Sequence, residues 1–170
     1  MDDGQLNGIA VGIILYDMGT EIERKFLVVD DAWREGAPAM PIRQGYLMTG
    51  ALTVRVRTMG ERAVLTLKKP LRGIARHEFE YEIPAADAEF MLNELCEGHV
   101  VEKTRYEVEF GGMAWVVDVF EGENAGLVVA EIELSAEEQV FERPPWLGAE
   151  VSEDARYLNS NLSQEPYCEW

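Results

Sequence analysis

Cysteine, histidine and long apolar runs are scarce in this sequence. Its 170 residues include 2 cysteines, at positions 96 and 168, and 2 histidines. That number and spacing exclude a disulfide framework, a zinc finger and a histidine-rich metal site. The longest apolar run, Ile9–Tyr16, is too short to cross a bilayer and lacks the basic flank of a signal peptide. We therefore expect a cytoplasmic protein that does not insert into a membrane.

Basic side chains are also few. The chain has 15 Lys and Arg residues against 32 Asp and Glu residues, which gives a formal net charge of −17. Because phosphates of nucleic acids are bound by Lys and Arg, this surplus argues against a nucleic-acid partner. It leaves open a local basic pocket. The hydrophobic share of 47% suffices for the core of one ordinary domain.

From Glu21 onward, apolar and polar residues alternate with a period of two, which indicates β-strands. The pattern predicts strands at residues 21–28, 43–49, 53–58, 63–69, 76–83, 103–110, 114–121 and 127–134. Helical periodicity appears at 85–97, and shorter helical segments are expected at 135–142 and 154–162. The chain is therefore predicted to be mainly β, antiparallel, with a few flanking helices.

The domain organisation is simple. Residues 20–165 are expected to form one domain, followed by a short tail at 166–170. Residues 1–19 lack the alternation, and Met18 directly precedes the patterned sequence. We interpret this segment as a disordered arm or an extension from an upstream start. A strand or an oligomer contact, such as one in a homodimer, is the alternative, because the apolar run would be exposed if unpaired.

The polar positions of the strands are mostly charged, and two interpretations follow. They form either the solvated outside of a barrel or the lining of a barrel wide enough for solvent and a small ligand. The repeated E-x-E, R-x-R and K-x-R patterns favour the second interpretation. Like charges on one strand face are destabilising, and divalent cations and a polyanion would compensate them.

The charged residues fall into two chemical sets. Arg and Lys side chains suit phosphate oxygens, and the paired glutamates Glu21/Glu23 and Glu131/Glu133 suit Mg²⁺ or Mn²⁺. No glycine-rich phosphate loop is present in the sequence. Phosphate binding would therefore depend on side chains.

These residues together resemble a known family. Glu21-Ile22-Glu23-Arg24-Lys25 is similar to the ExExK signature of the CYTH, or triphosphate tunnel metalloenzyme, superfamily. The resemblance continues in order to about residue 163. The matching segments are Arg55–Arg57, Leu65–Lys68, Arg76–Glu80, Glu102–Tyr106, Asp118–Phe120, Glu131–Glu133 and Asp154–Asn159.

The resemblance implies an eight-stranded antiparallel closed β-barrel tunnel that binds a triphosphate together with divalent cations. It implies metal ligands at Glu21, Glu23, Glu131 and Glu133. It implies triphosphate contacts from Lys25, Arg55, Arg57, Lys68, Arg76, Lys103 and Arg105. Catalytic roles, including activation of water, are expected among Lys25, Glu78, Glu80 and Asp118.

The resulting hypothesis is hydrolysis of inorganic triphosphate to pyrophosphate and phosphate, dependent on Mg²⁺ or Mn²⁺. Three alternatives stay open, because family membership does not determine the substrate. They are hydrolysis of an organic triphosphate such as thiamine triphosphate or a nucleotide, an adenylyl cyclase activity, and a binding module that senses polyphosphate without cleaving it. Trp33, Tyr46 and Trp115 are the aromatic residues that could stack on an organic group.

Overall fold

The computed structural model describes residues 20–70 and 75–170, except the side chains of Thr20, Glu21, Ala75 and Arg76. Its strands are β1 Thr20–Val28, β2 Ala39–Met48, β3 Thr53–Met59, β4 Arg62–Pro70, β5 Ala75–Glu82, β6 Glu97–Phe110, β7 Met113–Phe120, β8 Val128–Leu134 and β9 Leu147–Glu150. Its α-helices are α1 Ala85–Glu94 and α2 Asn159–Leu162, and three 3₁₀ turns lie at Gly122–Asn124, Ala155–Tyr157 and Tyr167–Glu169. Within these described ranges, no helix is both long and apolar enough to span a bilayer.

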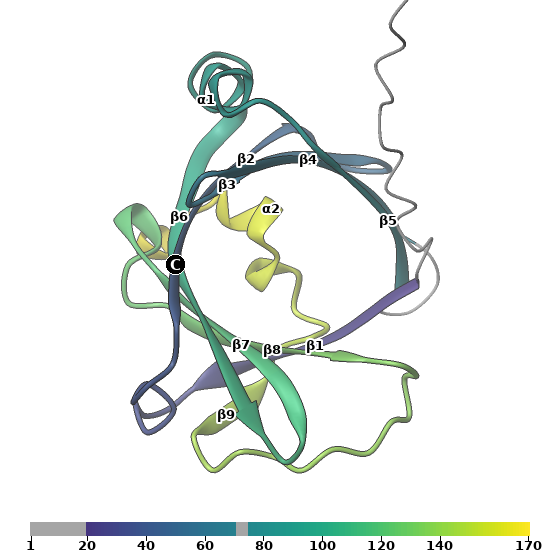
Figure 1. Cartoon of the computed structure of the whole chain (residues 1–170), viewed down its shortest axis with the longest axis vertical. Coiled ribbons are helices and arrows are strands. Elements are labelled where there is room, and N and C mark those ends of the chain that lie inside the picture. The colour runs from purple at the N-terminus through teal and green to yellow at the C-terminus, as the bar shows by residue number, and fades with distance from the viewer. Residues whose placement is uncertain (1–19, 71–74) are drawn as a thin grey trace, which may run out of the picture.

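All strand pairs are antiparallel, and the strands curve into a ring (Figure 1). The order is β5-β4-β3-β2-β6-β7-β8-β1-β9, and β1 also pairs with β5. The β1–β5 contact covers three residue pairs, from Thr20 opposite His77 to Ile22 opposite Ala75. On its other edge β1 pairs with β8 over six, from Ile22 opposite Leu134 to Leu27 opposite Val129. The predicted antiparallel β-barrel with flanking helices is thus confirmed.

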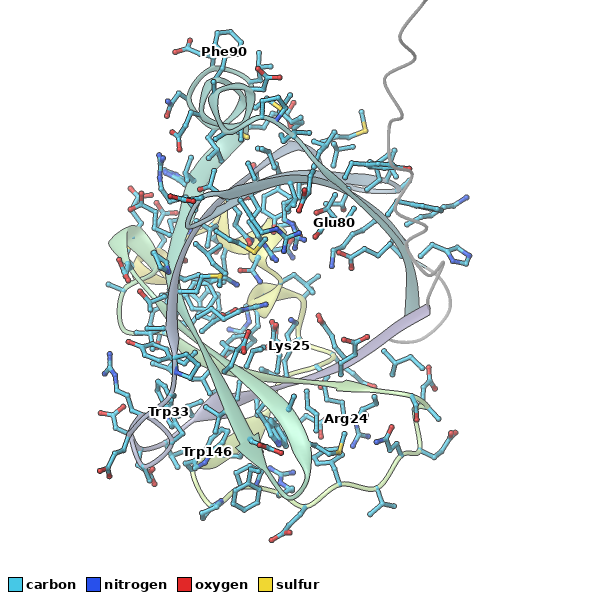
Figure 2. The ribbon with its side chains drawn as sticks, viewed as in Figure 1. Arg24, Lys25, Trp33, Glu80, Phe90 and Trp146 are labelled. Atoms are coloured by element: carbon cyan, nitrogen blue, oxygen red, sulfur yellow. The ribbon has the colours of Figure 1, made fainter. Side chains whose placement is uncertain are left out.

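The charged faces of the strands point into the ring. In Figure 2 the side chain of Lys25 projects inward, whereas Arg24, one residue earlier on β1, projects outward. Glu80 on β5 also projects inward. Because successive side chains on a strand alternate between faces, Glu23 on β1 and Glu78 on β5 also face the interior, where both line a cavity. The interpretation of the charges as a barrel lining is therefore correct, and the solvated-outside interpretation is wrong.

Most of the apolar core lies outside the ring. Phe26, Trp115 and Ile132 on β1, β7 and β8 form one buried cluster together with Trp33 and Trp146 from the loops. Figure 2 shows both of these loop tryptophans outside the ring. A second cluster packs α1 against β3 and β4. Its fully buried members are Val56, Ala63, Ala88 and Leu92. Burial of apolar area is the dominant stabilising term in folding, so the outer layers supply much of the stability.

A third cluster lies at one end of the ring. Val101, Phe120 and Val129 occupy inward positions, because they share strand parity with Lys103, Asp118 and Glu131. They pack against Leu162 of α2 and against Tyr157 and Tyr167. Figure 1 shows α2 inside the outline of the ring. The C-terminal segment therefore covers this end of the barrel with apolar contacts.

Two details differ from the sequence predictions. The short strand β9, which pairs with β1, was not predicted, since four residues are too few to show an alternation. The helix predicted at 135–142 is wrong: bends and a turn occupy residues 135–138. The side-chain oxygen of Gln139 accepts hydrogen bonds from the Ser135 backbone N–H (2.6 Å) and hydroxyl (2.7 Å), and such local bonds compete with helix formation. The interpretations of residues 1–19 lie outside the described residues.

Candidate active site

The barrel interior holds several buried charged side chains. Lys25 is 5% exposed, Arg55 6% and Lys103 1%. A buried charge is strongly destabilising unless it is paired or hydrogen-bonded. The partners of these groups therefore show which charges serve the fold and which remain available to a ligand.

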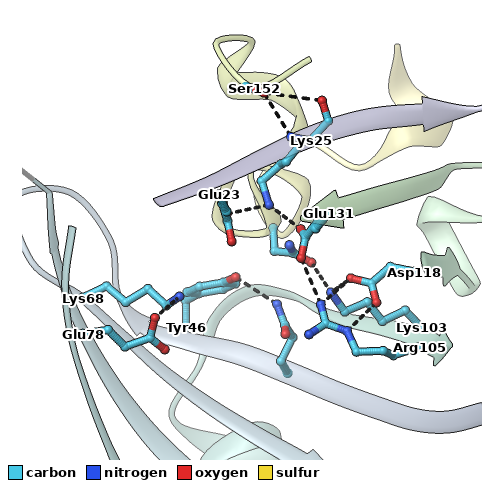
Figure 3. A network of polar contacts seen from close by, with 12 residues as sticks. Glu23, Lys25, Tyr46, Lys68, Glu78, Lys103, Arg105, Asp118, Glu131 and Ser152 are labelled. Atoms are coloured by element: carbon cyan, nitrogen blue, oxygen red, sulfur yellow. Dashed lines mark hydrogen bonds and ion pairs between the residues drawn. The ribbon is translucent and has the colours of Figure 1, made fainter. Parts of the chain in front are cut away.

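The carboxylates Glu23 and Glu131 converge on one ammonium group (Figure 3). Lys25 Nζ lies 2.7 Å from Glu23 Oε1 and also contacts Glu131 Oε1. Burial lowers the pKa of Lys25, but Glu131 and Glu23 outweigh burial and hold it above its ordinary value. The pKa of Glu131 lies well below its ordinary value, because Lys25 and Arg105 outweigh the effect of burial. Glu23 and Glu131 thus place anionic oxygens around the same position, that of the Lys25 ammonium group.

Asp118 accepts hydrogen bonds from two cations, Lys103 and Arg105, and Arg105 in turn contacts Glu131. The Asp118 carboxylate accepts two hydrogen bonds from Arg105, from Nε and Nη2, each 2.7 Å long. Lys103 Nζ donates to the same carboxylate and to Asn159 Oδ1, at 3.1 Å for the latter. Although burial acts in the opposite direction, Lys103 and Arg105 hold the pKa of Asp118 below its ordinary value. Asp118 is 1% exposed, so it orients the two cations from behind.

Arg55 and Arg57 on β3 lie across the interior and have weaker partners. Arg55 Nη2 donates to Thr66 Oγ1 at 3.0 Å and lies 3.6 Å from Glu78 Oε1. Its Nε is buried and has no hydrogen-bond partner among the described residues. Arg57 Nε donates to the side-chain oxygen of Gln44 at 3.0 Å. A neutral amide does not compensate the charge of Arg57, and the ion pairs of Arg55 with Glu78 and Glu80 are long, at 3.6 and 3.8 Å. The positive charge of this wall is therefore compensated only in part.

The electrostatics of Arg57 support this conclusion. Burial, and after it repulsion from Arg55 and Arg105, lower the pKa of Arg57 to about 9. A guanidinium in protein stays protonated in practice, so the shift indicates that the charge of Arg57 is unfavourably buried and lies close to other cations. An anion bound between these arginines would compensate this charge.

A cavity of about 200 Å³ lies between the acidic and the basic walls. Leu158, Asn159 and Ser160, in the C-terminal segment that covers one end of the barrel, also line it. Its other lining residues are Glu23, Lys25, Tyr46, Thr53, Arg55, Arg57, Lys68, Pro70, Glu78, Arg105 and Glu131. The cavity is thus bordered on one side mainly by the carboxylates Glu23 and Glu131 with Lys25 between them, and on the other mainly by cations with Glu78 among them.

Many of the predicted site residues meet at this cavity. They are Glu23, Lys25, Arg55, Arg57, Lys68, Glu78, Arg105 and Glu131. Lys103 and Asp118 lie behind Arg105, and Glu80 accepts a hydrogen bond from Thr66 at 3.3 Å. Glu133 is exposed, opposite Glu23 in the β1–β8 pairing. The side chains of Glu21 and Arg76 lie outside the described residues, although their backbones are register partners.

The structure adds residues that the sequence predictions missed as part of this site. Tyr46 lines the cavity, and Gln44 bridges Tyr46 and Arg57. Asn159 lines the cavity and bonds Lys103. Gln44 and Tyr46 are two residues apart, so the sequence already places them on the same face of a strand. Only their pairing with Arg57 and Arg55 shows that this face is the inner one.

The donor set fits a divalent cation that also binds phosphate. The described residues contain no group of three His, Cys, Asp or Glu side chains that could hold a metal by themselves. Mg²⁺ usually uses one or two carboxylates together with water and phosphate oxygens. Glu23 and Glu131, converging on one cationic position, match that requirement.

Comparisons with known proteins agree with this fold. A sequence model of the CYTH domain matches residues 19–167. The chain therefore belongs to the CYTH domain family.

Individual relatives are similar over almost their whole length. The inorganic triphosphatase of Acetivibrio thermocellus is 50% identical over 151 residues, covering 88% of this chain and 97% of the relative. The inorganic triphosphatase of Nitrosomonas europaea is 42% identical over 150 residues, covering 85% and 97%. A crystal structure of an inorganic triphosphatase aligns with a TM-score of 0.64 at 40% identity, covering 87% of this chain and 97% of that one.

Proposed function

We propose that this protein hydrolyses inorganic triphosphate to pyrophosphate and phosphate with the help of a divalent cation. The observation that carries the proposal is the cavity wall formed by Arg55 and Arg57. There, Arg57 donates to a neutral amide, and Arg55, whose ion pairs with Glu78 and Glu80 are 3.6 and 3.8 Å long, has a buried Nε–H without a hydrogen-bond partner among the described residues. The activity of the two relatives with more than 40% identity supports the same reaction.

The basic wall would bind the phosphate oxygens. Arg55, Arg57 and Lys68 border the cavity from β3 and β4, and Arg105 borders it from β6. Arginine donates to phosphate in a planar, bidentate geometry. Asp118 holds Arg105 in place before substrate arrives, so little reorganisation is required when charge develops in the transition state.

The acidic wall would hold the cation. We assign it to Glu23 and Glu131, with Glu21 and Glu133 as the further predicted ligands. When bound, Mg²⁺ or Mn²⁺ would neutralise phosphate charge and hold the triphosphate in line for displacement. Lys25 keeps the two carboxylates together and adds a positive charge next to the phosphate path.

Water positioning is assigned to Glu78. Of the two β5 carboxylates predicted for this role, Glu78 lines the cavity. It lies 2.6 Å from Lys68 Nζ and 3.6 Å from Arg55 Nη2, and its carboxylate, oriented by these two cations, would accept a hydrogen bond from the attacking water. Glu80 lies further along the wall, next to Thr66.

An inorganic substrate agrees better with the cavity than an organic one. Two of the three candidate stacking residues, Trp33 and Trp115, belong to the apolar cluster outside the ring. The third, Tyr46, lines the cavity, but its hydroxyl accepts a hydrogen bond from Gln44 at 3.0 Å. The cavity of about 200 Å³ is bordered mainly by charged groups, which match a bare phosphate chain.

The test is phosphate release from inorganic triphosphate, ATP and thiamine triphosphate, each with Mg²⁺, with Mn²⁺ and with EDTA. We expect fast release from inorganic triphosphate alone, lost with EDTA and restored by added metal. The variant Glu23→Gln/Glu131→Gln should lose about 100-fold in kcat/KM, because it removes the carboxylates that would hold the cation, and a bound cation supplies several kcal/mol of transition-state stabilisation. Glu109→Gln, a change of an exposed carboxylate on β6, is the matched control and should behave as the wild type.

The other outcomes separate the alternatives. Preferential release from an organic triphosphate would reassign the substrate. Formation of cyclic AMP from ATP would indicate a cyclase. Tight triphosphate binding with no product from any substrate would indicate a sensor, and activity that is unchanged by EDTA would contradict the metal requirement.

A further inference from the structure

A neutral side chain stands between two groups that line the cavity. Gln44 on β2 is 0% exposed and lies behind Arg57 and Tyr46. Its backbone pairs with that of Arg57 on β3, and Tyr46 follows two residues later on the same strand. Opposite residues of paired strands and i, i+2 neighbours share a face, so the position of Gln44 brings its amide to both groups.

The chemistry of the partners determines how this amide is oriented. Arg57 has donors and no acceptor, so the side-chain oxygen of Gln44 must face Arg57 Nε, at 3.0 Å. The NH₂ group of Gln44 then faces the hydroxyl oxygen of Tyr46, also at 3.0 Å. The flipped amide would set NH₂ against a guanidinium, and one orientation is therefore required.

This orientation has a consequence for Tyr46. Because its hydroxyl oxygen accepts from Gln44, its own hydrogen must point elsewhere, and Tyr46 lines the cavity. Burial raises the pKa of Tyr46, so the phenol keeps its proton at neutral pH. The Tyr46 O–H is thus available as a donor to an anion in the cavity.

Arg57 is affected in a parallel way. Arg57 Nε donates to the side-chain oxygen of Gln44. The two terminal nitrogens of Arg57 can therefore donate to a ligand in the cavity that Arg57 lines. Arg105 provides the contrast, because Asp118 and Glu131 hold it as ion pairs. A carboxylate at position 44 would orient Arg57 equally well but would neutralise it. The amide orients the guanidinium and keeps its charge for the ligand.

We propose that Gln44 is a positioning residue for the phosphate chain: its amide orients the Arg57 guanidinium without neutralising it and turns the Tyr46 hydroxyl hydrogen into the cavity. This inference rests on the proposed triphosphatase function. It concerns how the basic wall recognises phosphate oxygens.

The test compares two variants of nearly equal volume, Gln44→Glu and Gln44→Met. Binding of inorganic triphosphate is measured by calorimetry in EDTA, so that the basic wall is probed without turnover, and kcat and KM are then measured with Mg²⁺. Gln44→Glu neutralises Arg57 and makes the Tyr46 hydroxyl donate to position 44. We expect it to weaken triphosphate binding and kcat/KM by about 10- to 100-fold, the effect of lost hydrogen bonds to charged groups. Gln44→Met should weaken both less.

Stability is the readout that separates positioning from packing. Gln44→Glu adds an anion among mutually repelling cations, so its melting temperature should equal or exceed that of the wild type although triphosphate binding is weaker. A packing role predicts that affinity and stability fall together. Combining Gln44→Met with Tyr46→Phe gives a second test: if Gln44 acts through the hydroxyl, the double variant loses less affinity than the product of the single losses.

Three results would overturn the inference: triphosphate affinity of Gln44→Glu within twofold of the wild type, a loss of affinity that follows a loss of stability, or additive effects of Gln44→Met and Tyr46→Phe. If Gln44→Glu does not fold, the double-variant cycle decides alone. A wild type that neither binds nor cleaves triphosphate would refute the proposed function itself. An active wild type with unaffected Gln44 variants would refute only this inference.

Discussion

The two faces of the same barrel strands differ in their chemistry. On β1, Lys25 points inward between two carboxylates, and the next residue, Phe26, packs into an outer aromatic cluster. On β8, Glu131 and Ile132 repeat this division. In a globular domain with a filled core, the inward face carries the apolar residues. In this barrel, apolar clusters outside the ring bury much of the apolar surface. The interior is therefore available for a polyanion.

The interior itself contains two kinds of charge. Asp118 compensates Lys103 and Arg105 with hydrogen bonds of good geometry, whereas the charges of Arg55 and Arg57 are compensated only in part. The first arrangement compensates its buried charges within the protein, and the second leaves positive charge that a bound anion would compensate. Function and stability should therefore respond differently to substitutions on the two faces and within the interior.

The largest effect is expected on the outer face. Phe26→Ala removes a fully buried ring and leaves a cavity, so the free energy of unfolding should fall by about 3–5 kcal/mol. Urea unfolding measures the loss. The neighbouring Val29 is 65% exposed, and Val29→Ala should stay within about 0.5 kcal/mol of the wild type. An equal decrease in the free energy of unfolding in the two variants would contradict the conclusion that the outer cluster stabilises the fold.

The next effect concerns an inward residue that should behave like the outer core. Asp118→Asn leaves Lys103 and Arg105 without their common carboxylate. We expect a loss of about 3 kcal/mol in the free energy of unfolding, at the lower end for a broken buried ion pair because Asn keeps one acceptor. Urea unfolding next to the exposed control Glu109→Gln measures it. Unchanged stability would show that the interior charges do not support the fold.

Arg57→Met should separate function from stability in the opposite direction. Triphosphate binding in EDTA should weaken about 10- to 100-fold, or about 1.4–2.7 kcal/mol, because a guanidinium that lines the cavity is lost. Stability should change little, since the relief of charge burial and of repulsion from Arg55 and Arg105 offsets the lost hydrogen bond to Gln44. Calorimetry and urea unfolding on the same preparation test both statements. A destabilised variant would mean that Arg57 supports the fold.

The smallest effect is a pH dependence of stability. The pKa of Asp118 is lowered in the folded protein from 3.8, because Lys103 and Arg105 outweigh burial. Its ionised form therefore contributes stability that is fully present above the unfolded pKa and is lost as pH falls through the folded pKa. Urea midpoints measured from pH 6 down to pH 3 should fall more steeply in the wild type than in Asp118→Asn. Parallel curves would contradict this.

Much of the fold and of the site could be predicted from local pattern. The alternation located the first eight strands, because a period of two is a direct consequence of strand geometry. The resemblance to the CYTH superfamily placed eight of the predicted residues at what proves to be the cavity. The four-residue β9 and the turn at 135–138 were not predictable, because each depends on contacts with other segments rather than on a period.

Gln44 and Tyr46 show where local pattern is insufficient. Gln44 is uncharged and does not stand out from the rest of β2, and the sequence marks Tyr46 only as an aromatic residue that could stack on an organic group. Their role follows from the cross-strand register with Arg57 and Arg55, and register is a property of paired strands. Asn159 was likewise noted only as part of a matching segment, and the return of the C-terminal segment into the barrel places it beside Lys103.

The sequence by itself determined that this chain forms antiparallel strands with one charged and one apolar face, because alternation and side-chain chemistry are written residue by residue. Only the tertiary structure decided which face turns inward, which charges are neutralised and which stay available. The direction of strand curvature, the outer clusters around Phe26 and α1 and the C-terminal segment depend on contacts between distant residues. Those contacts turn rows of charge into a cavity with an acidic and a basic wall.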